Sequence, residues 1–261
     1  MDYQSILCEI KNSVAYMTLN RPKQYNSLTI QMSEEIAHAL EQWKNNPEVK
    51  VIVLSATGNA FCTGLEMSPQ LFNGEISDLG VVIEKYTSPI VELIRNMPKI
   101  VLCAVNGIAA GAGASLPLLC DITIAAKSAS FTQIFSKIGL IPDCGATWYL
   151  PRLVGFAKAK ALMLTGEKIS ATEAERIGMI YKVVEDDQLM PEVIQLAEHL
   201  ATQATVGLAL TKQAMNLTMQ HDLIAQLKIE QELQSKAGQT EYFFEAVRAF
   251  IMKEKPNFKG R

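Results

Sequence analysis

The chain has 261 residues, of which 49% are hydrophobic and 20% charged, with a formal net charge of −3. This composition is typical of a folded globular protein and excludes a disordered one, and the length allows one large domain or one domain with an appendage. The net charge and the lack of a basic stripe give no electrostatic case for nucleic acid. No uninterrupted apolar run reaches the ~20 residues that a bilayer span needs, so we expect no membrane partner.

The N-terminal stretch Met-Asp-Tyr-Gln-Ser has acidic and polar residues where a signal peptide has a basic start and an apolar block, so a cytoplasmic protein is expected. The cysteines are odd in number and form no C-x-x-C pair, which predicts small buried hydrophobes in a reducing compartment: Cys8, Cys62, Cys103, Cys120 and Cys144. Three histidines stand among charged neighbours in helical segments without metal-ligand spacing, and no metal site is expected from them: His38, His199 and His221.

The first two-thirds of the chain alternates strands and helices. Apolar alternation predicts strands at Ile6–Ile10 and Val14–Leu19, and apolar residues at helical spacing predict a helix over Ile30–Lys44. The elements expected next are strand Val51–Leu54, loop Ser55–Pro69, helix Leu79–Arg95, strand Ile100–Val105 and strand Asp121–Ala126. This order predicts an α/β fold with a largely parallel sheet and right-handed crossovers.

The last third is mostly helical. Ser170 and Glu173 have the spacing of a capping box, which predicts a short helix ending near Gly178. A closing strand is expected at Met179–Val184. From Asp187 onward the pattern is helical, with breaks near Ala204-Thr205 and Gln220 and a polar tail from Lys253 to Arg261. We therefore divide the chain into a core, residues 1–200, and a C-terminal helical region, residues 201–261, that is expected to pack on another subunit.

Two glycine-containing loops follow two of the apolar strands, at residues 59–67 and 106–114. Turns at the carboxyl edge of a sheet bind ligands, and glycine there lets backbone N–H groups approach a ligand closely. The second loop lacks the third glycine of the nucleotide fingerprint G-x-G-x-x-G, and the chain has no phosphate-loop lysine. Each loop alone is more often a structural turn than an active site.

Asp143 stands alone among apolar and small residues, after Pro142 and before Gly145. An unpaired buried carboxylate is costly and tends to shift its pKa. Asp143 is therefore either a turn residue that reaches water or a group that moves a proton. Cys144 beside it is a weaker candidate for a nucleophile, since no histidine is close in sequence. Two loops of N–H donors and one isolated base together suggest an oxyanion hole with a general base.

Five segments, in order and spacing, resemble the crotonase superfamily of enoyl-CoA hydratases and isomerases: Leu19–Pro22 with Asn26–Leu28, Phe61–Leu65, Ala104–Ala114, Cys120–Ile122 and Gly139–Arg152. The resemblance covers essentially the whole chain. Within the superfamily, Phe135–Gly145 is most similar to the 1,2-epoxyphenylacetyl-CoA isomerases and the Δ3,Δ2-enoyl-CoA isomerases.

The resemblance implies a crotonase-like spiral of ββα turns and a C-terminal helical oligomerisation region that forms a homotrimer or a dimer of trimers. It implies an acyl-CoA thioester as substrate, with coenzyme A part of that substrate and no further cofactor. The backbone N–H groups of Leu65 and Ala112 correspond to the family's oxyanion hole. The surrounding positions Cys62, Gly64 and Gly111 correspond to its CoA- and substrate-binding loops. No catalytic role is assigned to Glu66.

This sequence departs from the family pattern at the two positions that hold the attacking water in hydratases. Hydratases of this superfamily hold the attacking water between two glutamates, and the matching positions here are Ser115 and Phe135. Asp143 falls where several of the isomerases place their single acid. The resemblance therefore implies an acyl-CoA isomerase with Asp143 as catalytic base. The alternatives are a hydratase-like enzyme, an aryl-CoA-processing enzyme with Asp143 as nucleophile, or a CoA-binding scaffold without turnover.

Overall fold

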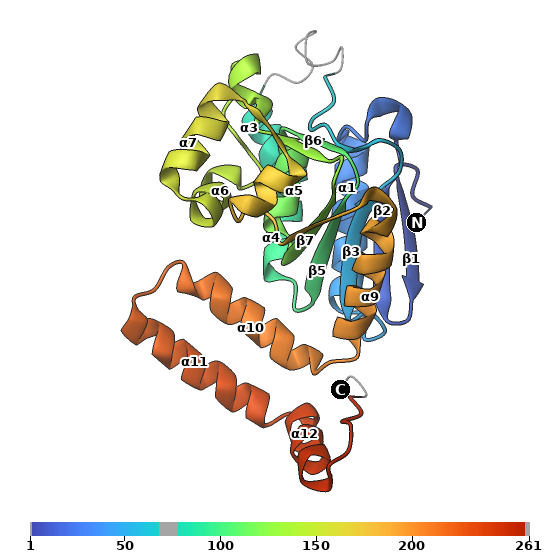
Figure 1. Ribbon diagram of the computed structural model, residues 1–261, viewed down its shortest axis with the longest axis vertical. Coiled ribbons are helices and arrows are strands. Elements are labelled where there is room, and N and C mark those ends of the chain that lie inside the picture. The colour runs from blue at the N-terminus through green and yellow to red at the C-terminus, as the bar shows by residue number, and fades with distance from the viewer. Residues whose placement is uncertain (1, 68–77, 259–261) are drawn as a thin grey trace.

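The computed structural model describes residues 2–67 and 78–258 (Figure 1). In these residues a larger sheet has the strand order β1-β2-β3-β5-β7-β10 and a smaller sheet the order β4-β6-β8-β9. The larger sheet consists of β1 (Ile6–Lys11), β2 (Val14–Leu19), β3 (Val51–Ala56), β5 (Ile100–Val105), β7 (Ile122–Ala126) and β10 (Lys182–Val184). The smaller sheet consists of β4 (Ala60–Cys62), β6 (Ile108–Ala110), β8 (Ser130–Thr132) and β9 (Lys168–Ser170).

Only the pairs β1–β2 and β8–β9 of these two sheets are antiparallel, so the expected largely parallel core is confirmed. Strand β3 is followed directly by β4, β5 by β6 and β7 by β8, so the chain passes from the larger sheet to the smaller one three times. These repeated ββα turns are the crotonase-like spiral that the sequence predicts. They bring the ends of β4 and β6 side by side.

Helices cover the sheets and continue beyond them. The α-helices are α1 (Ile30–Lys44), α3 (Leu79–Val82), α4 (Ser88–Asn96), α5 (Ala112–Leu119), α6 (Ala146–Val154), α7 (Phe156–Thr165), α8 (Ala171–Arg176), α9 (Leu189–Ala201), α10 (Thr205–Thr218), α11 (Leu223–Gly238) and α12 (Glu241–Met252). Short 3₁₀ turns lie at Pro22–Gln24, Ile134–Ile138 and Asp186–Gln188. In the described part of the chain, no helix combines the length and apolar character of a membrane span.

The core explains why the central strands β3 and β5 of the larger sheet are mostly apolar. Helix α9 packs on β2, β3, β5 and β7, and the buried faces of α1, α4 and α5 belong to the same apolar cluster. A parallel strand covered on both faces needs side chains that avoid water on both sides, as in the continuous apolar run of β5.

The polar N-cap Thr29 starts α1, because its Oγ1 accepts a hydrogen bond from the Met32 N–H at 3.1 Å.

The predicted helix Leu79–Arg95 is wrong as a single α-helix. A π-helical turn, Ile83–Thr87, separates α3 from α4. The physical reason is Pro89 at the start of α4, because proline has no N–H to donate to the preceding turn. The loop expected from Ser55 onward contains β4, and its last two predicted residues, Ser68 and Pro69, lie outside the described residues.

Three smaller expectations are also corrected. Only Lys182–Val184 of the predicted closing strand pairs with β7. Cys8 is exposed, because it lies on the outer part of the edge strand β1, and Cys120 is half-buried; the other three cysteines are buried. His221 precedes α11 instead of lying within a helix, although all three histidines are exposed as expected.

The C-terminal helices extend away from the sheets (Figure 1). Helix α9 is the last one that packs across the larger sheet. Helix α10 still contacts β5, α11 packs on α10, and α12 follows α11 after a short connection. The predicted breaks near Ala204-Thr205 and Gln220 are confirmed. A third break, at Gln239-Thr240, was not predicted; Thr240 caps α12 by accepting from the Phe243 N–H.

Candidate active site

The first predicted N–H donor, Leu65, lies in a loop that is fixed on both sides. The Leu28 N–H donates to the Gly64 carbonyl at 2.7 Å, and the Glu66 N–H donates to the Leu28 carbonyl at 2.9 Å. In such a parallel bridge the intervening residue turns its own N–H away from the partner. The Leu65 N–H has no acceptor among the described residues and is free to donate to a ligand.

The second predicted donor, Ala112, is the first residue of α5, where a helix leaves its N–H groups unbonded. Gly111 before it has φ 55° and ψ −131°, a conformation that glycine tolerates. Ala112 itself does not have a positive φ, so alanine fits this position without backbone strain. The Gly111 N–H donates to Thr132 of β8 at 3.0 Å and so anchors the turn.

The two loops touch through their backbones. A Cβ added to Gly64 would lie 3.2 Å from the Ala112 nitrogen, and one added to Gly113 would lie 2.1 Å from the Cys62 carbonyl oxygen. Side chains larger than hydrogen would force the loops apart. The structure therefore brings Gly64, Gly111 and the two predicted donors together, with their backbones in contact.

Cys62 in the first loop has a fully buried side chain, and burial raises the pKa of its thiol to about 12. The thiol therefore packs and stays neutral. The prediction that Cys62 contacts the substrate now applies to its loop, since the side chain itself is covered by protein.

Asp143 lies in a tight turn before α6. Cys144 and Gly145 both have positive φ, 49° and 73°, and the Ala146 N–H donates to the Asp143 carbonyl at 3.0 Å. Of the carboxylate oxygens, Oδ1 is buried without a hydrogen-bond partner among the described residues. Burial raises the pKa of Asp143, and the neighbouring Cys144 thiol offsets part of that rise.

A half-buried carboxylate with one unpartnered oxygen and a raised pKa is typical of a functional group, because a purely structural acid is normally paired or hydrated. Burial raises the pKa of the adjacent Cys144 thiol, the Asp143 charge adds to that rise, and the Thr87 hydroxyl opposes it, so Thr87 belongs to the surroundings of the acid. Thr87 lies in the π-helical turn, a local irregularity that is frequent at functional sites. Sequence reasoning missed Thr87, since the turn itself was read as an ordinary helix.

Ser115 and Phe135 supply no carboxylate. Ser115 is fully buried in α5 and its Oγ donates to the Gly111 carbonyl at 3.2 Å. Phe135 is 5% exposed, and its Cζ would lie 3.9 Å from a Cβ on Gly111. The phenyl ring therefore forms an apolar wall beside the second loop, and the hydroxyl holds the helix start. Neither side chain can take up a proton from water.

Glu66 has a structural role that the sequence did not reveal. Its Oε2 lies 2.6 Å from Arg21 Nη1 and accepts a hydrogen bond from Ser27 Oγ at 2.8 Å. The hydrogen bond with Arg21 lowers the pKa of Glu66 and keeps it ionised. Because Glu66 follows Leu65 directly, this ion pair helps to fix the loop that carries the first donor.

Asn26 anchors the other side of the same loop. Its Nδ2 donates to the carbonyls of Thr57 and Ala60, both at 2.9 Å, and its Oδ1 accepts from the Arg21 N–H at 2.7 Å. Asn26 is fully buried with φ 53°, a conformation that asparagine tolerates better than most residues. The motif around Arg21 and Asn26 was the only sequence signal for this anchor.

Among the described residues, no group of three or more histidine, cysteine, aspartate or glutamate side chains is close enough together to hold a metal ion. The groups that the site offers for chemistry are the two backbone donors and the carboxylate. Two N–H groups can accept negative charge on an oxygen, and a poorly solvated carboxylate can take a proton.

A spiral of ββα turns with two glycine-containing loops in contact at the strand ends defines a crotonase-fold protein. Over residues 9–261 the sequence matches the family model described as enoyl-CoA hydratase/isomerase, and the chain belongs to this family of enzymes. It is 43% identical over 258 residues to the 1,2-epoxyphenylacetyl-CoA isomerase of Escherichia coli (strain K12), with 98% of each chain covered.

Other relatives bear hydratase names. The chain is 34% identical to a crotonyl-CoA hydratase of Syntrophomonas wolfei, with 99% of each chain covered. Among solved structures, the enoyl-CoA hydratase of Bacillus anthracis superposes with a TM-score of 0.91 at 33% identity and covers 99% of this chain and 100% of its own. These similarities establish the family and the fold. The similar proteins include both isomerases and hydratases.

Proposed function

We propose that the protein is an acyl-CoA isomerase in which Asp143 is the single catalytic base. The observation that carries this proposal is the set of side chains at the site. Ser115 and Phe135 stand where hydratases of the family would hold water between two glutamates, and the buried Oδ1 of Asp143 has no partner among the described residues. A proton transfer between two carbons needs one carboxylate, whereas hydration by the two-glutamate route needs two.

In the proposed mechanism the thioester carbonyl accepts hydrogen bonds from the N–H groups of Leu65 and Ala112. Asp143 removes a proton next to the carbonyl, and the negative charge that develops on oxygen is stabilised by the two donors. One such donor is worth about 2.7–4 kcal/mol in comparable sites. Asp143 then returns the proton to another carbon, so that a 3,4 double bond becomes a 2,3 double bond.

Two substrates fit this chemistry: a 3-enoyl-CoA, and 1,2-epoxyphenylacetyl-CoA, whose enolate would precede ring expansion to an oxepin. Similarity to the isomerase of Escherichia coli favours the epoxide. Both reactions conserve all atoms of the substrate, so the proposal includes no cofactor beyond the coenzyme A of the thioester. The loops of Cys62 and Gly64 and of Gly111 are proposed to bind that thioester.

A second candidate function is hydration. The hydratase names of several relatives favour it, and Ser115 and Phe135 oppose it. An aryl-CoA-processing enzyme or a scaffold without turnover is supported by no contact in the described residues.

The test is a screen with 3-enoyl, 2-enoyl and epoxyphenylacetyl thioesters of coenzyme A. We expect conjugation of the 3-enoyl double bond, seen as an absorbance change, or conversion of the epoxide, with negligible addition of water to crotonyl-CoA. Hydration at a rate comparable to isomerisation would contradict the assignment of Ser115 and Phe135. Binding of all three without turnover would indicate a scaffold.

We further propose that residues 201–261 form a trimerisation region, so that the protein is a homotrimer or a dimer of trimers. Support comes from large apolar side chains on α11 and α12 that this chain leaves exposed: Leu223, Ile224, Leu227, Phe243, Phe244, Phe250 and Ile251. Exposed apolar surface of this extent normally lies in an interface. The cytoplasmic location stays a prediction.

A further inference from the structure

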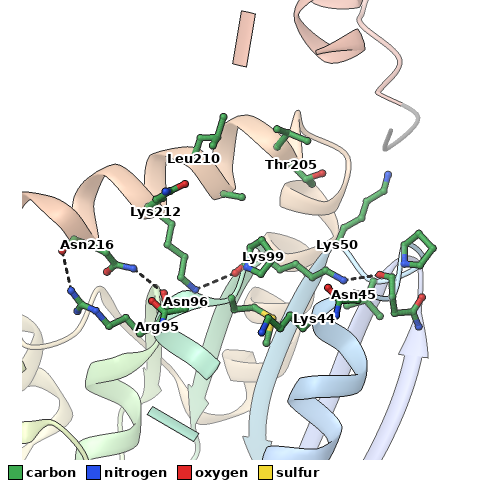
Figure 2. A pocket seen from close by; sticks show the side chains of 18 of the residues that line it. Lys44, Asn45, Lys50, Arg95, Asn96, Lys99, Thr205, Leu210, Lys212 and Asn216 are labelled. Carbon is green, nitrogen blue, oxygen red and sulfur yellow. Dashed lines mark hydrogen bonds between the residues drawn. The ribbon is translucent and has the colours of Figure 1, made fainter. Parts of the chain in front are cut away.

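A second cavity lies far from the catalytic loops, between α10 and the amino ends of the parallel strands. Its volume is about 710 Å³, within the range of small-molecule sites. Lys50 and Lys99, which line it, come immediately before β3 and β5. The loops of Leu65 and Ala112 follow these strands at their carboxyl ends. The cavity therefore opens at the opposite edge of the sheet (Figure 2).

The charged side chains that line the cavity all have the same sign. Its charged lining side chains are all cationic: Lys44, Lys50, Arg95, Lys99 and Lys212. Asparagine and glutamine side chains and the hydroxyl groups of Thr205 and Tyr242 complete the polar lining, and no carboxylate belongs to it. Five positive charges in one cavity are unexpected in a chain whose formal net charge is −3.

Lys212 is the one buried side chain among these five cations, and it has a counter-charge. Its Nζ lies 2.8 Å from Asp121 Oδ2 and also donates to the carbonyls of Ile94 and Lys99. All three of its protons are thus used, and Figure 2 shows the side chain reaching from α10 down to the strand ends. Lys212 therefore offers the cavity no free donor, and Asp121 offsets its positive charge.

Arg95 and Lys99 contact only neutral acceptors. Arg95 donates to Tyr149 Oη and to the Asn216 carbonyl, both at 2.9 Å, and lies over the Trp148 ring. Lys99 Nζ donates to the carbonyls of Trp43 and Asn46. Burial without a counter-charge lowers the pKa of Lys99 to about 8. Both cations keep unused donors.

Lys44 and Lys50 are the remaining two cations that line the cavity. Lys44 Nζ lies 3.7 Å from Glu41, a weak and exposed contact. The Lys50 ammonium has no hydrogen-bond or ion-pair partner among the described residues. Partly buried cations without counter-ions are costly, and an anion between them would remove that cost.

We propose that this cavity binds a phosphate-bearing small molecule, at a site separate from the catalytic loops. Arginine and lysine donors around a concave, partly desolvated space suit a phosphate group. The anion would lie in the cavity near Lys50, Arg95 and Lys99 of the core, on the side that faces α10. It would thereby link the C-terminal helices to the core.

Calorimetric titration with pyrophosphate at low salt tests the site. Wild-type protein should bind, and the affinity should fall as sodium chloride is added. Lys50→Met should weaken binding about tenfold, an effect of the size expected from the loss of one charged contact to a phosphate. Lys168→Met, which removes an exposed lysine on β9, is the matched control and should bind like the wild type.

Proton uptake when the anion binds provides a second test of the site. Near pH 8 Lys99 is only partly protonated, and an anion beside it favours the charged form, so binding should take up protons. The other titratable groups that line the cavity are Lys44, Lys50, Arg95, Lys212 and Tyr242. Titrations in buffers of different ionisation enthalpy should detect the uptake in the wild type and not in Lys99→Met. Because Lys99→Met also removes two hydrogen bonds, its melting temperature is measured alongside.

Equal affinity in the wild type and in Lys50→Met, or no binding at low salt, would overturn the proposal. A CoA thioester titration separates this site from the catalytic one. Lys50→Met should leave CoA affinity unchanged if the anion site is distinct. A loss of CoA affinity as large as that for pyrophosphate would place the phosphate in the catalytic site and would equally overturn the proposal.

Discussion

The Asp143 carboxylate is held by the backbone of its turn, and no cation pairs with it among the described residues. The Ala146 N–H and the positive φ angles of Cys144 and Gly145 fix the turn, while burial raises the pKa of the acid. A carboxylate in these conditions is more basic than one in water, as a proton-transfer role requires. The same burial makes the charge costly for stability. Replacement of Asp143 should therefore affect activity and stability in different ways.

Replacing Asp143 by asparagine should separate catalysis from folding. The change keeps the shape of the side chain and removes its basicity, so isomerisation should fall by about 10²–10⁴-fold. CoA-thioester affinity should persist, because the donors of Leu65 and Ala112 belong to the backbone. The melting temperature should hold or rise, since an amide is cheaper to bury than an unpaired charge. Asp187→Asn, an exposed aspartate, is the control.

A turn-residue role for Asp143 would give the opposite pattern, with nearly unchanged turnover and a lower melting temperature. Rate, affinity and melting temperature measured on the one variant therefore decide between the two interpretations.

The raised pKa of Asp143 also predicts a pH dependence. Because the base acts only when ionised, kcat/KM should fall as pH decreases through a pKa above the ordinary value of 3.8. An acid whose pKa is higher in the folded state destabilises the fold above that pKa, and this cost disappears as pH falls towards the unfolded value. Any stability gain of Asp143→Asn should therefore shrink at acidic pH. A rate profile limb at or below 3.8 would contradict the buried-base model.

At the scale of elements, α10 is attached to the core mainly through polar contacts at its inner face. Lys212 pairs with Asp121 at 2.8 Å, and Asn216 Nδ2 donates to the Arg95 carbonyl at 2.8 Å. Asp121 in turn accepts from the Val101 N–H at 2.8 Å, next to the start of β5. Burial raises the pKa of Asp121, and Lys212 opposes this rise. The helix is thus positioned by one buried ion pair and the hydrogen bonds around it.

Lys212→Met should destabilise the fold by about 1–3 kcal/mol, because it leaves the partly covered Asp121 carboxylate without its cation and two backbone carbonyls without their donor. Chemical denaturation measures the loss. The matched control is Lys127→Met, which breaks the surface pair with Glu185, where both side chains are more than half exposed. We expect little change there, since solvent screens exposed ion pairs. Equal losses in the two variants would show that the Lys212 pair does not position α10.

At the scale of the whole molecule, the exposed apolar side chains of α11 and α12 need a partner to cover them. Phe250 is 85% exposed and Leu223 71%. A helical region with such a surface, and no sheet of its own, is expected to be stable only when other subunits cover it. The proposed trimer is a closed arrangement that meets this need.

Mass measurement in solution should therefore give three or six copies at micromolar concentration. Changing Phe244 and Phe250 together to serine should shift the population towards smaller species, because each buried aromatic contributes strongly to an interface. Leu7→Ser on the edge strand β1, where the leucine is 52% exposed, should leave the mass unchanged. A wild-type protein that is monomeric at this concentration would refute the assembly.

The sequence by itself determined the elements whose side chains repeat with a clear period. Helix α1 and strands β2 and β5 have the predicted bounds, because their apolar periodicity reports directly which faces are buried. It also determined the isolation of Asp143, since Pro142 and Gly145 mark a loop around the only acid of that stretch. The motif resemblance then identified the family, which the family model confirms.

Only the tertiary structure decided the features that depend on distant partners. The strands β4, β6, β8 and β9 have three residues each, too few for a periodic signal, and exist because they pair with one another. The ion pair of Lys212 with Asp121 joins residues 91 positions apart, and no local pattern encodes it. The pKa of Asp143 likewise depends on what covers the carboxylate. Burial and electrostatics are properties of the packed chain, because each depends on neighbours that folding brings together.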